Sequence, residues 1–256
     1  MAKTISIANQ KGGVGKTTTA VNLASSIAVA EMKTLLVDLD PQGNATSGMG
    51  LKVEEGQPSV YEVMIGNASA EEAIVASELP NLYVLPASIK LVGAEIELVG
   101  MVAREAMLRK ALAEVKDRYD YIFIDSPPSL GLLTLNGLTA ADTILIPIQC
   151  EYYALEGLSQ LLNTVRLVQK HLNSGLGIEG GLLTMYDHRL NLSRQVADDI
   201  RKYFDGRVFE TMIYRNVRLS EAPSYGKPIL LYDITSRGAE NYLALAEELL
   251  SHDSPA

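Results

Sequence analysis

Residues 8–19 read Ala-Asn-Gln-Lys-Gly-Gly-Val-Gly-Lys-Thr-Thr-Thr, and this stretch decides the fold. It follows an alternating apolar run at residues 5–8, which predicts a buried strand, and it leads into residues 20–24, which predict a helix. Glycines let the backbone between the two elements turn its N–H groups inward around an anion, and the helix N-terminus adds partial positive charge. The stretch therefore predicts a phosphate-binding loop.

Two lysines distinguish this loop from an ordinary P-loop. Lys16 is placed to reach the β- and γ-phosphates of a nucleotide, and the Thr17 hydroxyl to ligate Mg²⁺. The usual pattern has glycine six residues before the lysine, whereas this chain has Gln10 there and a second lysine, Lys11, directly after it. On its own Lys11 is interpreted as a solvated surface lysine. The glycines and Lys16-Thr17 at these spacings favour nucleotide binding instead.

The composition is that of a globular protein, with 47% hydrophobic and 21% charged residues. One cysteine, Cys150, excludes a disulfide framework and a metal site made only of cysteines. No run reaches the roughly 18 apolar residues of a membrane span, and the first strand begins too early to leave room for a signal peptide. We therefore expect a cytoplasmic protein.

The net charge of −9, taken alone, argues against nucleic acid as a partner. The charge is unevenly distributed, however. Residues 186–237 hold nine Lys and Arg against seven Asp and Glu, a net charge of +2, which leaves −11 for the rest of the chain. A basic surface patch in this segment is therefore compatible with the composition.

Carboxylates follow two apolar runs of the sequence. Residues 34–37 predict a buried strand that ends in Asp38 and Asp40, and residues 121–124 predict another that ends in Asp125 before two prolines. In open α/β sheets ligands bind at the carboxyl ends of the strands, which brings these acids beside the phosphates. We predict that Asp38 and Asp125 hold Mg²⁺, the latter as a Walker B aspartate. For Asp38 the alternative is that it caps the following turn.

Strands alternate with helices along the rest of the chain. Further strands are predicted at residues 81–86, 142–148 and 181–185. Helices are predicted at residues 89–98, 101–115, 151–171, 192–204 and 237–250. Residues 43–80, which glycine and proline interrupt, predict loops and short helices. The fold class is therefore α/β, a doubly wound, mostly parallel sheet with helices on both faces, in a single domain over residues 1–256.

Nearly the whole chain resembles the ParA/Soj family of chromosome-partitioning ATPases, a branch of the ParA/MinD ATPases with a lysine-first, or deviant Walker A, loop. The matching stretches are residues 9–19, 37–48, 124–133, 147–157 and 216–227. The resemblance implies an enzyme that hydrolyses ATP with Mg²⁺ and forms an ATP-dependent homodimer. It also implies nonspecific DNA binding on the nucleoid and release when a ParB-like partner stimulates hydrolysis.

The same resemblance implies roles for individual residues. Lys11 would reach across the dimer to the partner's phosphates, and Asp40 would orient the attacking water beside Lys16. Asn216 would contact the adenine, although the family usually has proline where this chain has Tyr214. Arg189 and Arg218 match DNA-contacting positions, and each has the alternative of a solvated surface charge. The nucleotide would lie against Lys11, Gly12, Gly13, Val14, Gly15, Lys16, Thr17, Thr18, Tyr214 and Asn216.

Two other functions remain open at this point. One is a MinD-like ATPase that acts at a membrane surface. MinD relatives end in a basic amphipathic helix, whereas residues 246–253 are acidic and would be repelled by anionic lipid, so we expect no membrane partner. The other is a metabolic ATP-dependent ligase of the same fold, which would need a small acid for turnover. ATP-dependent retention on DNA separates the ParA-like function from both.

Overall fold

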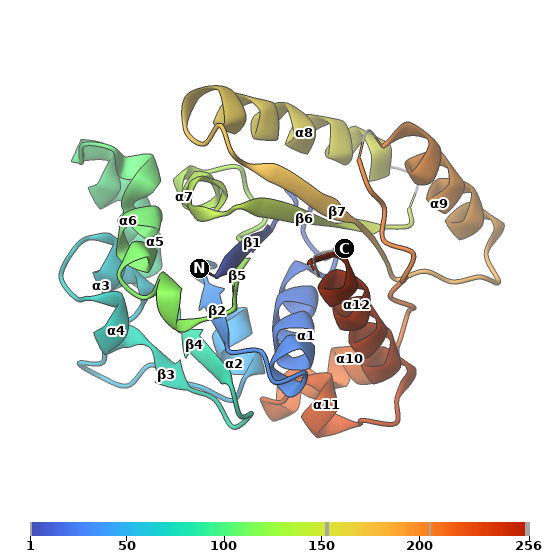
Figure 1. Ribbon diagram of the computed structural model, residues 1–256, viewed down its shortest axis with the longest axis horizontal. Helices are drawn as coiled ribbons and strands as arrows, with labels where there is room; N and C mark the ends of the chain where they lie inside the picture. Colours follow the sequence, from blue (N-terminus) through green and yellow to red (C-terminus); the bar gives the residue numbers. More distant parts are fainter. Residues whose placement is uncertain (1, 152–153, 205, 254–256) are drawn as a thin grey trace.

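In the computed structural model, seven strands form one sheet in the order β3-β4-β2-β5-β1-β6-β7 (Figure 1). The structure describes residues 2–151, 154–204 and 206–253. Neighbouring strands run parallel except β3 and β4, which are antiparallel. The strands are β1 (Lys3–Ile7), β2 (Thr34–Asp38), β3 (Val75–Ala76), β4 (Leu82–Leu85), β5 (Tyr121–Asp125), β6 (Thr143–Gln149) and β7 (Gly177–Thr184).

Helices cover both faces of this sheet (Figure 1). The longer ones are α1 (Lys16–Val29), α5 (Leu91–Glu97), α6 (Met107–Ala113), α7 (Leu132–Ala140), α8 (Ala154–His171), α9 (Asn191–Tyr203) and α12 (Arg237–Asp253). The shorter ones are α2 (Asn44–Gly48), α3 (Val60–Met64), α4 (Ala70–Ala73), α10 (Val217–Glu221) and α11 (Ile229–Tyr232). Single 3₁₀ turns lie at η1 (Leu98–Gly100), η2 (Arg104–Ala106), η3 (Lys116–Arg118) and η4 (Ala222–Tyr225). The predicted doubly wound α/β fold is confirmed.

The alternation of side chains along each strand divides the core between the two faces. Leu36 of β2 and Phe123 of β5 pack into the cluster that contains α1 and α12. Their neighbours Leu35 and Ile122 point the other way, into the cluster that contains α3, α5 and α6. Both faces of the central strands are therefore buried, and the carboxyl ends of β1, β2 and β5 meet at one edge.

Three elements differ from their predicted bounds. The helix predicted at residues 101–115 is shortened to α6, because Ala103 adopts a left-handed conformation with φ of 55° before η2. β7 begins at Gly177 rather than at residue 181. Its glycines are needed there, since a Cβ on Gly180 would come within 2.8 Å of the Phe209 ring. The helix predicted from residue 151 is α8, and Tyr152 and Tyr153 lie outside the described residues.

Candidate functional site

The loop between β1 and α1 wraps around the side chain of Lys16. Gly13 and Gly15 take φ values of 74° and 88°, which glycine adopts without strain. Gly15 is the N-cap of α1 and offers no side-chain acceptor, so the first N–H groups of the helix are available to an anion. Lys16 is buried, and its Nζ donates to the carbonyl oxygen of Lys11 at 2.9 Å. The predicted phosphate-binding loop thus has the geometry of an anion site.

Asp125 ends β5 with a fully buried carboxylate. Neither of its oxygens makes a hydrogen bond of good geometry to a described residue, although the Thr17 hydroxyl lies close enough to lower its pKa. Burial and the neighbouring Asp38 outweigh that effect and raise the pKa of Asp125 well above its usual range. Burial lowers the pKa of Lys16, and the carboxylates of Asp125 and Asp40 oppose that shift. An unpaired carboxylate in this position suits a bound cation.

Asp38 lies beside Asp125 on the adjacent strand, but its carboxylate is already hydrogen bonded. Its Oδ2 accepts from the backbone N–H and the hydroxyl of Thr46, at 2.8 and 2.7 Å, and its Oδ1 accepts from the backbone N–H of Asp40 at 3.2 Å. Burial raises the pKa of Asp38 to about 6, against the effect of these bonds. These contacts match the alternative in which Asp38 holds the following turn. Its role as a metal ligand stays a prediction.

Asp40 begins the turn after β2 and lies close enough to Lys16 to affect its pKa. Its Oδ1 accepts from the backbone N–H of Gln42 at 2.9 Å, which fixes the side chain at the edge of the sheet. In the part of the chain that the structure describes, no three His, Cys, Asp or Glu side chains gather closely enough to hold a metal by themselves. Mg²⁺ commonly takes one or two carboxylates and completes its shell with phosphates and water. The Thr17 and Asp125 pair fits that pattern.

Lys11 is partly exposed and forms an ion pair with Glu151. Its Nζ lies 3.1 Å from a carboxylate oxygen of Glu151, and its backbone N–H donates to the Asn9 side chain at 3.0 Å. Asn9 in turn donates to the carbonyl of Pro147 at 2.7 Å, which fixes the start of the loop against β6. Lys11 thus lies at the surface, and its backbone is held by the hydrogen bonds of Asn9.

A pocket of about 390 Å³, the base pocket, opens beside the phosphate-binding loop. Tyr214, Asn216, Gly15 and Thr18, which were predicted to bind the nucleotide, line this pocket together. The Asn216 side-chain oxygen caps α10 by accepting from the backbone N–H of Arg218 at 2.8 Å. Residues that were not predicted also line the base pocket, among them Thr184, Met185 and Tyr242. Thr184 ends β7, Met185 directly follows it, and Tyr242 lies on α12, and their local sequence carries no motif.

The two arginines predicted for DNA lie on separate segments. Arg189 makes two hydrogen bonds to Asp187, whereas Arg218 on α10 lies 2.9 Å from Glu221. Arg189 lines a second pocket of about 220 Å³, which we call the arginine pocket, and Arg218 is not among the residues that line it. The arginine pocket is formed by Tyr186, Asp187, His188, Arg189, Tyr214, Arg215 and Arg237. Arg215 and Arg237 carry no motif and were not predicted.

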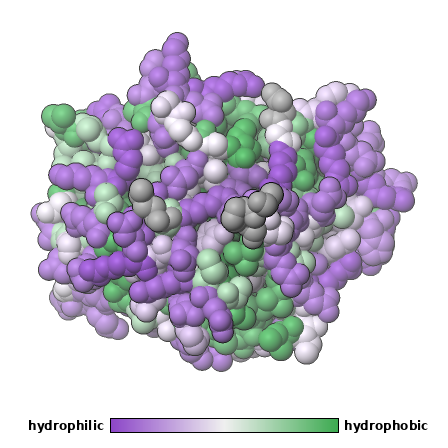
Figure 2. Space-filling model, in the orientation of Figure 1, coloured by the Kyte–Doolittle hydropathy of each residue, from purple (hydrophilic) through white to green (hydrophobic). Residues whose placement is uncertain are grey.

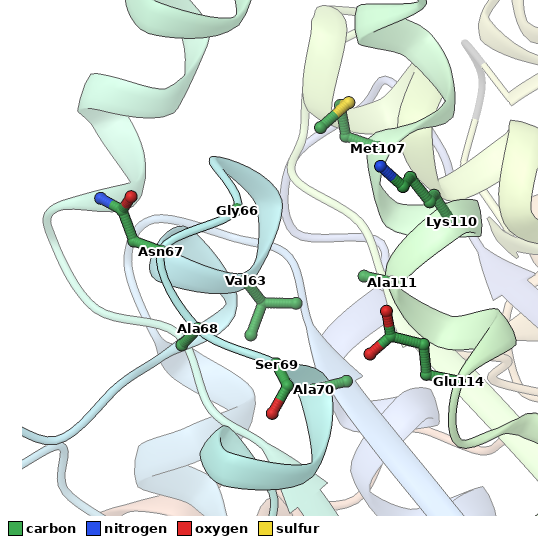
Figure 3. Close-up of a pocket in the computed structure, with 10 residues that line it drawn as sticks. All are labelled: Val63, Gly66, Asn67, Ala68, Ser69, Ala70, Met107, Lys110, Ala111 and Glu114. Carbon is green, nitrogen blue, oxygen red and sulfur yellow. The ribbon is translucent and has the colours of Figure 1, made fainter.

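Another pocket, of about 360 Å³, lies between the α3–α4 connection and α6 (Figure 3). Lys110 of α6 and Glu114, which directly follows α6, line it opposite Val63 and Ser69 (Figure 3). None of the residues predicted to bind the nucleotide lines this pocket. It is therefore separate from the site described above.

The outer surface is mostly polar on the face drawn in Figure 2, with apolar side chains gathered over α1 and α11. The exposed large apolar side chains include Val29 at the end of α1 and Ile234 just after α11. Among the described residues, no helix combines the length and the apolar character that crossing a membrane requires.

A family model described as an AAA domain matches residues 2–178 of the chain. The sporulation initiation inhibitor protein Soj of Bacillus subtilis is 60% identical over 252 residues, which cover 98% of this chain and 100% of that protein. The chromosome partitioning protein ParA of Myxococcus xanthus is 57% identical over 255 residues, which cover 100% of this chain and 90% of that protein.

Solved structures share the fold as well. A cobyrinic acid a,c-diamide synthase from Mycobacterium smegmatis, crystallised with ADP and magnesium, superposes with a TM-score of 0.86 at 38% identity. The match covers 98% of this chain and 95% of that one. A structural neighbour of this similarity therefore holds a nucleotide and magnesium on the same fold.

Proposed function

This chain belongs to the Soj/ParA family of chromosome-partitioning ATPases, and we propose that it is an ATP-driven DNA-binding switch. Residues 1–256 act as one P-loop ATPase domain, which binds ATP with Mg²⁺ and then pairs with a second copy of itself. The homodimer binds DNA without regard to sequence. Hydrolysis, stimulated by a ParB-like partner, separates the dimer and releases the DNA. Such a protein works in the cytoplasm, on the nucleoid.

The observation that carries this proposal is the juxtaposition of Lys16 and Asp125 at the end of the phosphate-binding loop. The lysine is buried and donates to a backbone carbonyl, while the carboxylate is buried and has no hydrogen bond of good geometry within the described chain. Burial lowers the pKa of Lys16, and Asp125 lies close enough to oppose that shift. A nucleotide triphosphate with Mg²⁺ supplies both missing partners, an anion for Lys16 and a cation for Asp125.

Catalysis here consists of positioning and charge stabilisation rather than covalent chemistry. Lys16 exchanges the Lys11 carbonyl for phosphate oxygens, and the loop N–H groups from Gly12 to Thr18 surround the phosphates. Thr17 and Asp125 would hold Mg²⁺, which neutralises the charge that develops on the transferred phosphoryl group. Asp40 orients the attacking water beside Lys16, and Asp38 keeps the backbone of Asp40 in place through its hydrogen bond.

Lys11 supplies the link between ATP and dimerisation. Its amino group lies in an ion pair with Glu151, and both side chains are partly exposed. In the dimer each Lys11 exchanges Glu151 for the phosphates of the partner's nucleotide. Because a γ-phosphate is needed to attract it, the dimer forms with ATP and separates after hydrolysis.

One alternative has a specific observation in its favour. The cobyrinic acid a,c-diamide synthase that shares the fold is, by its name, an enzyme of small-molecule synthesis. Such a ligase would turn over ATP only in the presence of a small acid. The Soj and ParA proteins, at 60% and 57% identity, support the partitioning function more strongly than this neighbour at 38%.

Retention on DNA tests the proposal. The protein should be retained on immobilised duplex DNA with ATP and Mg²⁺, and should dissociate when ADP replaces ATP. Asp40→Ala should bind ATP, fail to hydrolyse it, and stay on DNA. Retention that is equal with ATP, with ADP and without nucleotide would refute the switch. ATP turnover that requires a small acid and ignores DNA would favour the ligase, and ATP-dependent sedimentation with anionic vesicles would favour the membrane-surface ATPase.

A further inference from the structure

The arginine pocket brings together charged side chains from three distant segments. Arg189 comes from the connection after β7, Arg215 from the segment before α10, and Arg237 from the first turn of α12. One carboxylate, Asp187, lines the pocket with them. Three guanidinium groups against one carboxylate give the pocket a net positive charge, in a protein whose net charge is −9.

The arginines of this surface differ in how far their charge is neutralised. Arg189 donates through Nε and Nη2 to the two oxygens of Asp187, at 2.9 and 2.7 Å, and these bonds hold the pKa of Asp187 well below its usual range. Arg218 lies 2.9 Å from Glu221 and 3.5 Å from Asp233. Within the described residues, neither Arg215 nor Arg237 forms an ion pair with a carboxylate. Their charge is therefore available to an external anion.

Arg237 is also held in a defined orientation. Its guanidinium carbon lies 3.4 Å from the centroid of the Tyr214 ring, a stacked cation–π contact. Tyr214 is fixed in turn by its backbone N–H, which donates to the Asn241 side chain at 3.2 Å, and by an edge contact with Tyr186 at 5.4 Å. Stacking covers the face of a guanidinium and leaves its N–H edge free, so Arg237 is preorganised to bind a phosphate.

We propose that Arg215 and Arg237 are the principal phosphate ligands of the DNA surface, ahead of Arg189 and Arg218. The proposal rests on the proposed function, in which the dimer binds DNA. A backbone phosphate enters the arginine pocket and meets the edge of Arg237 and the side chain of Arg215. Arg189 and Arg218 contribute less, because each must first leave a carboxylate of its own chain.

Tyr214 and Arg215 link this DNA surface to the nucleotide. Both residues line the base pocket and the arginine pocket. Loss of Arg237 therefore frees the ring that forms a wall of the base pocket, and ATP affinity should fall severalfold. Inorganic tripolyphosphate has no base, so its affinity should stay the same. A general loss of structure would weaken both ligands alike.

The experiment compares three double variants on one duplex DNA, at saturating ATP, over a series of salt concentrations. They are Arg215→Ala with Arg237→Ala, Arg189→Ala with Arg218→Ala, and the control Arg109→Ala with Arg166→Ala. The control removes two exposed arginines that hydrogen bond only to neutral oxygens in the described structure. Sedimentation with ATP establishes that each variant still dimerises before its DNA binding is compared.

The salt dependence of binding identifies the phosphate ligands. Each phosphate that the protein no longer neutralises reduces the slope of log affinity against log salt by about 0.9. The Arg215 and Arg237 variant should therefore show a slope smaller by roughly 3.6, for four phosphates in a dimer. The control should match the wild type, and the Arg189 and Arg218 variant should fall between. An unchanged slope for the Arg215 and Arg237 variant, with a large decrease for the other pair, would overturn the inference and leave the proposed function intact.

Two further measurements separate the outcomes. Tyr214→Phe keeps the ring under Arg237 and should bind DNA more tightly than Tyr214→Leu, which removes the stack and should weaken both DNA and ATP binding. If Tyr214→Leu binds DNA with wild-type affinity, the stack does not prepare Arg237 for phosphate. Failure of the wild type itself to bind DNA with ATP would refute the proposed function and this inference together.

Discussion

The phosphate-binding loop and the arginine pocket both contain charged side chains, but these side chains differ in burial and in pairing. At the loop, Lys16 and Asp125 are buried on adjacent parts of the sheet edge, and each lacks a counterion of its own in direct contact. At the arginine pocket the guanidinium groups are exposed, and Arg189 is already paired with Asp187. Burial raises the free-energy cost of an unpaired charge at the loop, so each charge there strongly favours a ligand of opposite charge. At the pocket, solvent screens each charge.

This difference predicts how strongly each site responds to a substitution. Removal of a buried charged group changes a strong local field, because the medium around it has a low dielectric constant. Removal of an exposed arginine alters a surface field to which several residues contribute. The effects below should therefore decrease from the loop to the pocket.

Lys16→Ala should have the largest effect, because it removes the charge-assisted hydrogen bonds to the phosphates. Two such bonds are worth about 3 kcal/mol or more, so ATP affinity should fall at least roughly 100-fold. Isothermal titration calorimetry measures this directly, with Lys90→Ala as a control for the loss of an exposed lysine. ATP affinity within a few-fold of the wild type would refute the role of the loop.

Lys11→Ala should have the second-largest effect, and it tests the exposed lysine of the same loop. The monomer should bind ATP through Lys16 and the loop amides, while the ATP-dependent dimer and hydrolysis should both be abolished. Sedimentation velocity with ATP measures the dimer. Glu151→Gln is the matched variant, since it frees Lys11 from its ion pair and should leave dimerisation as strong or stronger. Normal dimerisation of Lys11→Ala would remove the basis for a cross-subunit lysine.

Asp125→Asn should separate stability from activity. An ionised carboxylate that is buried without a partner in direct contact costs more free energy than a neutral amide in the same place, so the variant should unfold at a higher temperature at pH 8 while its Mg²⁺-dependent hydrolysis is abolished. The pKa of Asp125 in the folded protein lies above its ordinary value of 3.8, so the folded state binds the proton more tightly than the unfolded state does. The free energy of unfolding of the wild type therefore falls as pH rises from about 4 towards the folded pKa.

The advantage of Asp125→Asn should accordingly shrink as the pH is lowered towards 4. Thermal melts in the absence of nucleotide, at a series of pH values, give the comparison. A variant that is less stable than the wild type at pH 8 would mean that Asp125 has a compensating partner in the folded protein.

Asp187→Asn should have the smallest effect, and it should increase the affinity for DNA. It releases Arg189 from its ion pair and raises the net charge of the arginine pocket by one. The ATP-bound dimer should therefore bind DNA a few-fold more tightly at low salt. The gain should disappear at high salt, because exposed charges are screened. Asp117→Asn, which removes an exposed carboxylate from η3, is the control. Equal gains for both variants would mean that overall charge matters and the position does not.

Local motifs made much of the fold and the nucleotide site predictable. The strand before residue 8 and a helix at residues 20–24 follow from adjacent sequence, as do the carboxylates at the ends of β2 and β5, although α1 begins earlier, at Lys16. Parallel strands place their carboxyl ends together, so Lys16, Asp38 and Asp125 could be assigned to one edge. The two-residue strand β3 was not predicted, because Val75 and Ala76 form too short a run for a periodicity.

The arginine pocket could not be predicted, for a physical reason. Its members are separated by up to 51 positions in the sequence, from Tyr186 to Arg237, and tertiary packing alone brings them together. The composition indicates the basic segment but cannot say which arginines are neutralised by neighbouring acids. The ion pair of Arg189 with Asp187 spans only two residues, yet its geometry depends on the turn between them.

The carbonyl oxygen of Lys11 has a consequence for the order of events. It accepts from Lys16 Nζ at 2.9 Å, so the two lysines are joined through one peptide group. In the proposed mechanism Lys16 would turn to a phosphate, and the backbone of Lys11 would then lose this restraint while keeping its N–H bond to Asn9. Occupation of a chain's own site would thus come before Lys11 reaches the nucleotide of the neighbouring chain. Two chains would therefore dimerise only after each has bound its own nucleotide, and a chain without nucleotide would dimerise weakly.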